Sequence, residues 1–180
     1  MDLTRQPPRR PSNAGIAAIV GLARMTDKAR GHNAELLGEY KYGETSGLDC
    51  EVLELMGLGA EEFAEAADRL WDIELEAWVR ERMQCSPADI DKFNDEQLTR
   101  EPLDDLHRRL LRERIDKYAA GRSDISTVYA SIELDDWGAF RDEDLTVRPP
   151  RTAFLRSVVG IVGAARMGDK ARGKRAGKLG

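Results

Sequence analysis

Apolar residues recur at the three-to-four-residue spacing of one helix face along most of this chain. The first such stretch follows a proline-rich entry, and Ser12 or Asn13 can cap a helix from about Ala14 to about Leu36. Its apolar face contains Ile16, Ile19, Val20 and Ala23. Continued at helical spacing, this face reaches Asp27 and Arg30, so charged side chains extend the apolar stripe instead of lying opposite it.

The same reasoning predicts further helices with clear start and stop signals. Ser86-Pro87-Ala88-Asp89 combines a cap, a first-turn proline and an acid in the third helical position. Gly38 to Gly43 is a brief connector with at most a short hairpin, and no segment requires a sheet. We predict a compact all-α domain of about six to seven helices, the later ones covering about 49–56, 60–70, 72 onward, 86–98, 104–120 and 124–134.

Several large apolar residues are expected to face the core of these helices. They include Phe63, Ala67, Leu70, Trp71, Ile73, Leu75, Trp78, Val79, Leu106, Leu110, Leu111, Ile115, Val128, Tyr129 and Ile132. Trp137 is the exception, because we place it after the last helix, where it can pack against Phe140.

One segment of the chain occurs twice. Residues 2–38 align without a gap with residues 144–180, and more than half of the aligned positions are identical. The longest conserved block between the copies is Arg24-Met25-Thr26-Asp27-Lys28-Ala29-Arg30-Gly31, which returns with one substitution as Arg166-Met167-Gly168-Asp169-Lys170-Ala171-Arg172-Gly173. The chain therefore contains one whole unit, residues 1–143, and the opening of a second, residues 144–180.

A lone helix cannot bury its own apolar face, so the second copy should dock on the first unit or on another chain. Ala17, Ala18 and Gly21, opposite Gly160, Gly163 and Ala164, would let the two copies of the helix pair closely, within a chain or in a homo-oligomer. After about Arg172 the tail carries little apolar surface, and we expect it to fray.

Charge and cysteine content restrict the class of protein. The net charge of −5 over 180 residues argues against nucleic acid as a partner, although residues 166–178 are locally basic. Cys50 and Cys85 match no zinc or redox spacing, the first residues do not resemble a signal peptide, and no apolar run is long enough to span a bilayer. We expect a cytoplasmic protein with no membrane association and no cofactor.

Several motifs together carry a resemblance to a known family. They are Asp-Leu-Thr with Pro-Pro-Arg, Arg-Met-x-Asp-Lys-Ala-Arg, Leu37-Gly38-Glu39-Tyr40, Leu48-Asp49, Trp78-Val79-Arg80, Ser86-Pro87, Gly121-Arg122-Ser123-Asp124 and Leu134-Asp135-Asp136. In this order they resemble a bacterial all-helical family catalogued only as a domain of unknown function, over residues 2 to about 137. The resemblance implies a fold unit and no activity.

The repeated charges form the candidate site. Arg24, Asp27 and Lys28 lie at positions i, i+3 and i+4 of one helix, and two cations within one turn repel each other unless an anion lies between them. One hypothesis is a pocket for a phosphate or carboxylate ligand, with Arg24 and Lys28 as donors, Asp27 orienting Arg30, and Tyr40 or Tyr42 closing the site. The ligand-binding set would be Arg24, Asp27, Lys28, Arg30, Glu39, Tyr40 and Tyr42, with repeat counterparts Arg166, Asp169, Lys170 and Arg172.

Two other interpretations use the same residues. In the first, the charges form an internal network without a ligand, with Asp27 paired to Arg30 and Glu39 paired to Arg24 or Lys28. In the second, the protein is an enzyme acting on a phosphorylated or carboxylated small molecule, with Asp27 or Glu39 as acid or base.

Other chemistry is poorly supported. His32 and His107 have no paired-ligand spacing, so we predict no metal site. The carboxylates Glu133, Asp135, Asp136 and Asp142 could hold a hard cation but read better as a solvated helix end. Cys85 precedes a helix start but has no histidine near it in sequence, which favours a packing role over a nucleophilic one.

Overall fold

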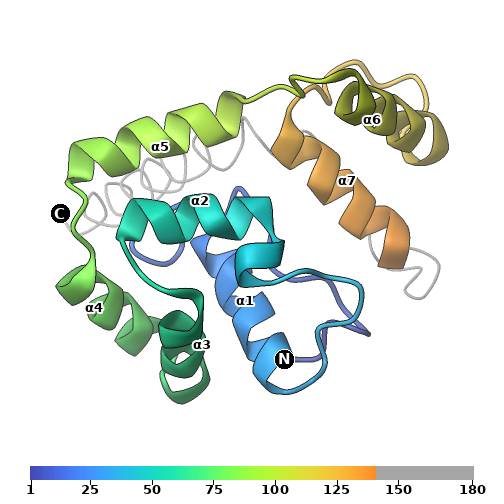
Figure 1. Ribbon diagram of the computed structural model, residues 1–180. Coiled ribbons are helices and arrows are strands. Elements are labelled where there is room, and N and C mark those ends of the chain that lie inside the picture. The colour runs from blue at the N-terminus through green and yellow to red at the C-terminus, as the bar shows by residue number, and fades with distance from the viewer. Residues whose placement is uncertain (141–180) are drawn as a thin grey trace, which may run out of the picture. The chain divides into compact units, whose positions relative to one another are not determined.

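A computed structural model of the protein describes residues 1–140 (Figure 1). These residues form seven α-helices and no β-strand, which confirms the all-α prediction. The elements are α1 (Leu22–Asn33), the short 3-10 helix η1 (Gly43–Thr45), α2 (Gly47–Met56), α3 (Ala60–Arg69), α4 (Asp72–Arg82), α5 (Pro87–Thr99), α6 (Asp105–Tyr118) and α7 (Val128–Phe140).

Helix α1 is the centre of the main hydrophobic core. It packs against α2 and α3, while α4 adjoins α3 and α5 adjoins α2 (Figure 1). Leu22, Ala23, Met25 and Ala29 of α1 are fully buried against residues of these helices, Phe63 among them. A smaller second core joins α6 to α7 and contains Leu111, Ile125, Leu134 and Trp137.

The first helix begins later than the apolar spacing predicts. It starts at Leu22 and not at Ala14, and residues before it form turns in which Ala17 and Ala18 have positive φ angles of 53° and 61°. The side chain of Asn94 in α5 accepts from Val20 N (3.0 Å) and donates to Ala18 O (2.7 Å). These bonds satisfy backbone groups that a helix would otherwise pair, so tertiary contact replaces the expected helical turns.

The predicted bounds of most of the later helices are confirmed. Ser86 caps α5, and its side chain and that of Asp89 bond reciprocally to each other's backbone N–H groups. Asp104 caps α6 by accepting from His107 N (2.9 Å), and Gly57 ends α2 in the left-handed conformation.

The prediction that α7 ends near Leu134 is wrong. The helix continues to Phe140, so Trp137 lies within it and packs edge-on against Tyr118 of α6, with ring centroids 6.3 Å apart. Gly138 makes this helix pairing possible, because a side chain there would overlap the Tyr118 ring. The close approach to α6 explains why a glycine is accepted inside a helix.

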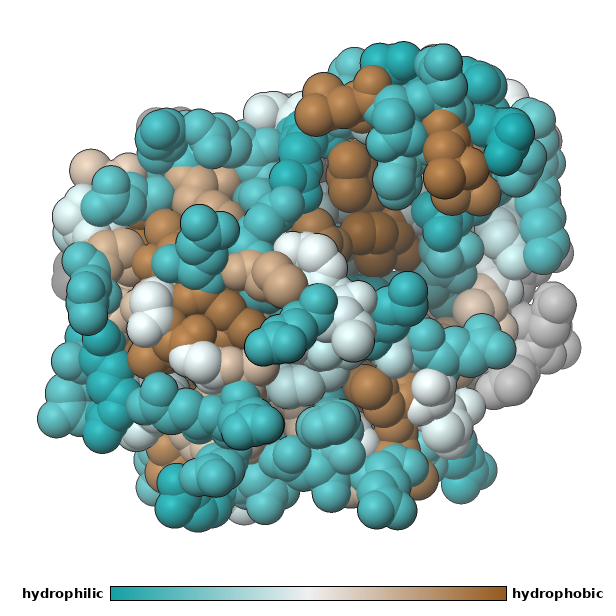
Figure 2. All heavy atoms as spheres, in the orientation of Figure 1, coloured by the Kyte–Doolittle hydropathy of each residue, from teal (hydrophilic) through white to brown (hydrophobic). Residues whose placement is uncertain are grey.

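Three residues predicted to be buried lie at the surface. Trp71 and Ile73 at the start of α4 are 81% and 84% exposed, and Leu106 of α6 is 52% exposed. Helix α4 packs through Leu75 and Val79, whereas the side chains of Trp71 and Ile73 at its start lie outside the core. Figure 2 shows apolar side chains at the surface as well as inside a hollow beside the part that contains α6.

Residues 141–180 lie outside this description. They include Asp142 and all of the second copy, so the predicted boundary at residues 143/144, the frayed end after about Arg172 and the second helix remain predictions. Ala17 and Gly21, two small residues expected to pair with that helix, are buried within residues 1–140.

Candidate functional site

The charged residues of α1 are buried, but they do not converge on one point as the sequence predicts. Arg24, Asp27 and Lys28 are at most 6% exposed, and Arg30 is partly buried. Their side chains leave the helix toward different elements, and each ends on a partner from another part of the chain.

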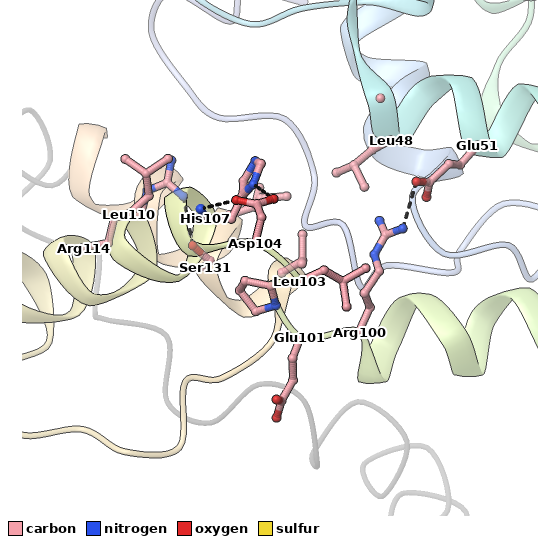
Figure 3. A pocket seen from close by; sticks show the side chains of 14 residues that line it. Leu48, Glu51, Arg100, Glu101, Leu103, Asp104, His107, Leu110, Arg114 and Ser131 are labelled. Carbon is pink, nitrogen blue, oxygen red and sulfur yellow. Dashed lines mark hydrogen bonds and ion pairs between the residues drawn. The ribbon is translucent and has the colours of Figure 1, made fainter.

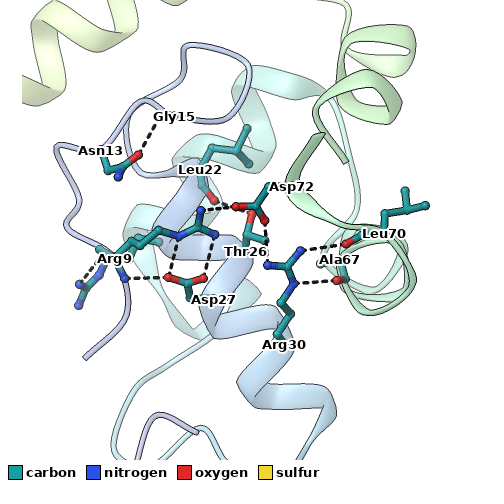
Figure 4. Close-up of polar contacts among 11 residues, drawn as sticks. Arg9, Asn13, Gly15, Leu22, Thr26, Asp27, Arg30, Ala67, Leu70 and Asp72 are labelled. Carbon is teal, nitrogen blue, oxygen red and sulfur yellow. Dashed lines mark hydrogen bonds and ion pairs between the residues drawn. The ribbon is translucent and has the colours of Figure 1, made fainter. Parts of the chain in front are cut away.

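Arg9, from the segment before α1, binds Asp27. Its backbone N, Nε and Nη2 donate to the two carboxylate oxygens at 2.8, 2.9 and 2.8 Å, respectively (Figure 4). Both oxygens of Asp27 are thus occupied by one arginine, which fastens the proline-rich entry to α1.

Asp72, the first residue of α4, bridges Arg9 and Arg30 (Figure 4). The contacts measure 2.5 Å to Arg9 Nη1 and 2.8 Å to Arg30 Nη1. Arg30 also donates to the carbonyls of Ala67 and Leu70, both at 2.9 Å, where α3 ends. Burial raises the pKa of Asp72, but the hydrogen bonds from both arginines outweigh it and hold the pKa below the usual 3.8.

Arg24 reaches α7. Its Nη1 lies 2.6 Å from Oδ2 of Asp136, and its Nη2 lies 3.2 Å from Oδ1. Tyr40 donates its hydroxyl to the same carboxylate at 3.0 Å, and the Arg24 guanidinium lies over the Tyr40 ring, 5.4 Å from the centroid. Burial, together with the charge of Asp136, raises the pKa of the Tyr40 hydroxyl.

Lys28 and Asp49 form the most deeply buried ion pair of residues 1–140, with side chains 5% and 4% exposed and Nζ 2.6 Å from Oδ1. Lys28 also donates to Ser46 Oγ (3.0 Å), and Asp49 accepts from Gly43 N (3.2 Å). Burial lowers the pKa of Lys28 and raises that of Asp49, so desolvation opposes the charged state of both partners.

The partners differ from those that helical spacing indicates. Asp27 pairs with Arg9 and not with Arg30, while Glu39 is exposed and makes none of the described ion pairs with Arg24 or Lys28. Tyr42 donates to Ala60 O (2.7 Å) and not to a charged residue of the cluster. The residues that sequence reasoning missed are Arg9, Asp49, Asp72 and Asp136 in their pairing roles. Arg9 had a signal, since it is retained as Arg151 in the second copy.

The acidic run at the end of the domain also has local partners. Glu133 accepts from Ser12 Oγ (2.5 Å), and Asp135 accepts from Arg114 Nη2 (2.8 Å). Among residues 1–140, no three histidine, cysteine or acidic side chains are grouped so as to hold a metal ion. None of the helices described there is long and apolar enough to cross a membrane.

A cavity of about 520 Å³ lies where α2, the α5–α6 connection, α6 and α7 meet (Figure 3). Its apolar lining comprises Leu48, Pro102, Leu103, Leu110, Val128 and Ile132. Its polar border contains Glu101 and three pairs, namely Arg100 with Glu51 (2.8 Å), Arg114 with Ser131 (2.9 Å) and His107 with Asp104 (2.6 Å). Its size and mainly apolar lining are typical of small-ligand cavities.

A second cavity, of about 820 Å³, is lined by Tyr42 and has an acidic border formed by Glu44, Glu61, Glu62 and Glu65. These four carboxylates repel an anionic ligand. This side of Tyr42 is therefore unsuited to the phosphate or carboxylate pocket in which the sequence placed that tyrosine.

The fold and the charge network define a small all-α domain whose first helix is held by buried ion pairs. The chain belongs to the family described as "Domain of unknown function (DUF5069)", whose sequence model matches residues 5–137. This match confirms the resemblance to a family of unknown function. No curated protein matches the chain.

Proposed function

We propose that this protein is a binding module whose ligand occupies the cavity between α2, α6 and α7, and that the Arg24–Arg30 charges hold the fold together. The observation that carries the proposal is that the cations of α1 are already paired. Arg24, Lys28 and Arg30 each lie within 2.8 Å of a carboxylate of the same domain. An anion added at the cluster would have to displace a carboxylate that belongs to the domain.

The contacts at Asp27 support a binding role over a catalytic one. A general acid or base needs an oxygen within hydrogen-bonding reach of its substrate. Arg9 occupies both oxygens of Asp27, and Glu39, the other proposed acid or base, is exposed at the surface.

The ligand that suits the cavity is a small molecule with an apolar body and one carboxylate. Leu48 from α2 and Leu103 from the α5–α6 connection supply apolar surface on two sides (Figure 3). A guanidinium has five N–H donors, and Arg114 uses two of them in its described bonds to Ser131 and Asp135. Arg114 also faces a carboxylate, Asp135, but its side chain is 29% exposed and borders the cavity, whereas those of Arg24 and Lys28 are 7% and 5% exposed. Its remaining donors can therefore bind a ligand carboxylate beside Asp135, while apolar contact at about 25 cal/mol per Å² supplies most of the affinity.

A fluorescence titration with 1-anilinonaphthalene-8-sulfonate, displaced by octanoate, tests this site. Leu103→Glu should weaken binding of both probes, because it places a carboxylate beside the apolar lining. The matched control is Ile73→Glu, since Ile73 is 84% exposed and Leu103 80%, but Ile73 lies in α4 away from the cavity lining. Equal affinities of the two variants for the probes would contradict the proposal.

The carboxylate preference has its own comparison. Arg114→Met should weaken octanoate binding more than octanol binding, because only octanoate carries the anionic group. An equal loss for both ligands would assign the effect to packing and would remove Arg114 from the site.

We also assign the protein to the cytoplasm. Cys50 and Cys85 are free thiols in the structure, and free thiols are typical of a reducing compartment. Fractionation of cells that express the protein, with thiol labelling of each fraction, tests this assignment.

A further inference from the structure

Residues 2–38, here called the opening segment, are bound by residues 39–140, here called the body, through three buried or partly buried carboxylates. Asp49 pairs with Lys28, Asp72 pairs with Arg9 and Arg30, and Asp136 pairs with Arg24. These three carboxylates of the body lie where the cations of the opening segment bind. We call the surface formed by Asp49, Asp72 and Asp136 the acidic seat.

The second copy, residues 144–180, retains every cation that the acidic seat binds. Arg9, Arg24, Lys28 and Arg30 recur as Arg151, Arg166, Lys170 and Arg172, in the same order and at the same spacing. Asp27, which orients Arg9, recurs as Asp169.

Buried apolar positions are retained as well. Ile19, Val20, Ala23, Met25 and Ala29 are at most 1% exposed, and they recur as Ile161, Val162, Ala165, Met167 and Ala171. Gly21 has a φ of 84°, and a side chain there would have little space beside Val52 and Tyr129; this glycine recurs as Gly163. Retention at these positions follows the contacts to the body and not merely a demand for helix.

Many of the positions that changed lie at the surface of the opening segment. Arg10, Ala14, Ala18, Glu35 and Leu36 are exposed, and each has a different residue in the second copy. An exposed position makes few contacts with the body, so its substitution leaves the bound face intact.

Other changes weaken the second copy as a ligand of the acidic seat. The buried Leu22 is replaced by Ala164, which removes apolar volume from the core. Ser12, which donates to Glu133, is replaced by Phe154, and Asn33, which donates to Ala64 O, is replaced by Arg175. The opening segment should therefore bind more strongly than the second copy.

We propose that residues 144–180 bind the acidic seat of their own chain in exchange with residues 2–38. Two segments then share one binding surface, and whichever segment is released becomes free to contact other molecules. The covalent connection favours exchange within one chain, because it gives the second copy a high effective concentration at the body. The charges favour this occupant over an unrelated helix, because any segment that replaces residues 2–38 buries Asp49 and Asp136 again and must supply a cation for each.

Hydrogen–deuterium exchange of the full chain, read from peptides covering 22–33 and 164–175, tests the proposal. Ala164→Leu restores the side chain that Leu22 provides in the first copy. It should slow exchange of the 164–175 amides and speed exchange of the 22–33 amides, by roughly tenfold if the populations shift that far. Adding Arg24→Ala and Lys28→Ala should enlarge both changes, because Asp136 and Asp49 then lack cations from the opening segment, whereas the second copy retains Arg166 and Lys170.

Lys174→Ala is the control, because it removes a cation at a position whose counterpart, His32, is exposed. It should leave both peptides unchanged. If Ala164→Leu leaves exchange of the 164–175 amides at the wild-type rate, the proposal is wrong, and because this variant alters no residue of 1–140, a folding failure of the body does not obscure the result. A protection change that occurs only at higher protein concentration would mean that residues 144–180 bind the body of another protein molecule. That result would overturn the proposal of exchange within one chain.

Discussion

Arg24 of α1 and Asp136 of α7 form a buried ion pair 2.6 Å long between residues that are 112 positions apart in the sequence. The pair connects the helix at the centre of the main core to the helix that carries the second core. Tyr40 completes it from the connector after α1. The most strongly repeated motif of the sequence therefore contributes to the long-range closure of the domain.

Removing Asp136 should destabilise the protein strongly. Asp136→Ala leaves the Arg24 guanidinium buried without its carboxylate, and such uncompensated charges cost about 3–5 kcal/mol. Urea unfolding followed by circular dichroism measures the loss. Glu76→Ala is the control, because Glu76 pairs with Arg80 at the surface of one helix, where about 0.3–0.5 kcal/mol is expected. Similar losses for the two variants would contradict the buried-pair account.

Lys28 and Asp49 should show a large coupling in a double-mutant cycle. Lys28→Met or Asp49→Leu alone leaves one buried charge unpaired and should cost about 3–5 kcal/mol, whereas the double variant removes both charges and should cost far less than the sum. Free energies of unfolding of the four proteins at neutral pH provide the measurement. Additive losses would mean that the two groups do not depend on each other.

Asp72 should contribute to the acid sensitivity of the domain. Its pKa in the folded state lies below the usual 3.8, so its contribution to stability is fully present above 3.8 and is lost as the pH falls through the lowered folded-state value. Asp72→Asn should reduce stability at neutral pH and flatten the dependence of unfolding free energy on pH below about 4. Glu76→Gln, an equal change of charge at the surface pair, is the control. An unchanged acid limb in Asp72→Asn would show that this carboxylate is not the titrating group.

Gly21 should not tolerate alanine. Its φ of 84° is left-handed, which costs other residues about 1–2 kcal/mol. A Cβ there would lie 3.1 Å from Val52 Cγ2 and 3.2 Å from the Tyr129 hydroxyl. Thermal unfolding of Gly21→Ala should therefore show a clear loss of stability. Gly47→Ala, where no atom lies within 4 Å of the new Cβ, should be neutral or slightly stabilising. An equal result for the two variants would contradict the backbone argument.

Local sequence was sufficient for the all-α class and for most helix boundaries. The Ser86–Asp89 capping box and the Asp104 cap depend on side chains within three residues of the helix start. Such bonds form between neighbours in the chain and need no tertiary partner, so they can be predicted from residue order.

The tertiary structure decided the features that depend on distant segments. Helix α1 begins at Leu22 because Asn94 bonds to the turns before it, and α7 reaches Phe140 with Gly138 packed on Tyr118. Retention in two copies marked the charged positions of the repeat as constrained. Helical spacing, however, indicated ion-pair partners within one turn of the same helix. The actual partners Asp49, Asp72 and Asp136 come from α2, α4 and α7, because a buried charge takes its counter-ion from whichever segment packs against it, and only the fold determines that segment.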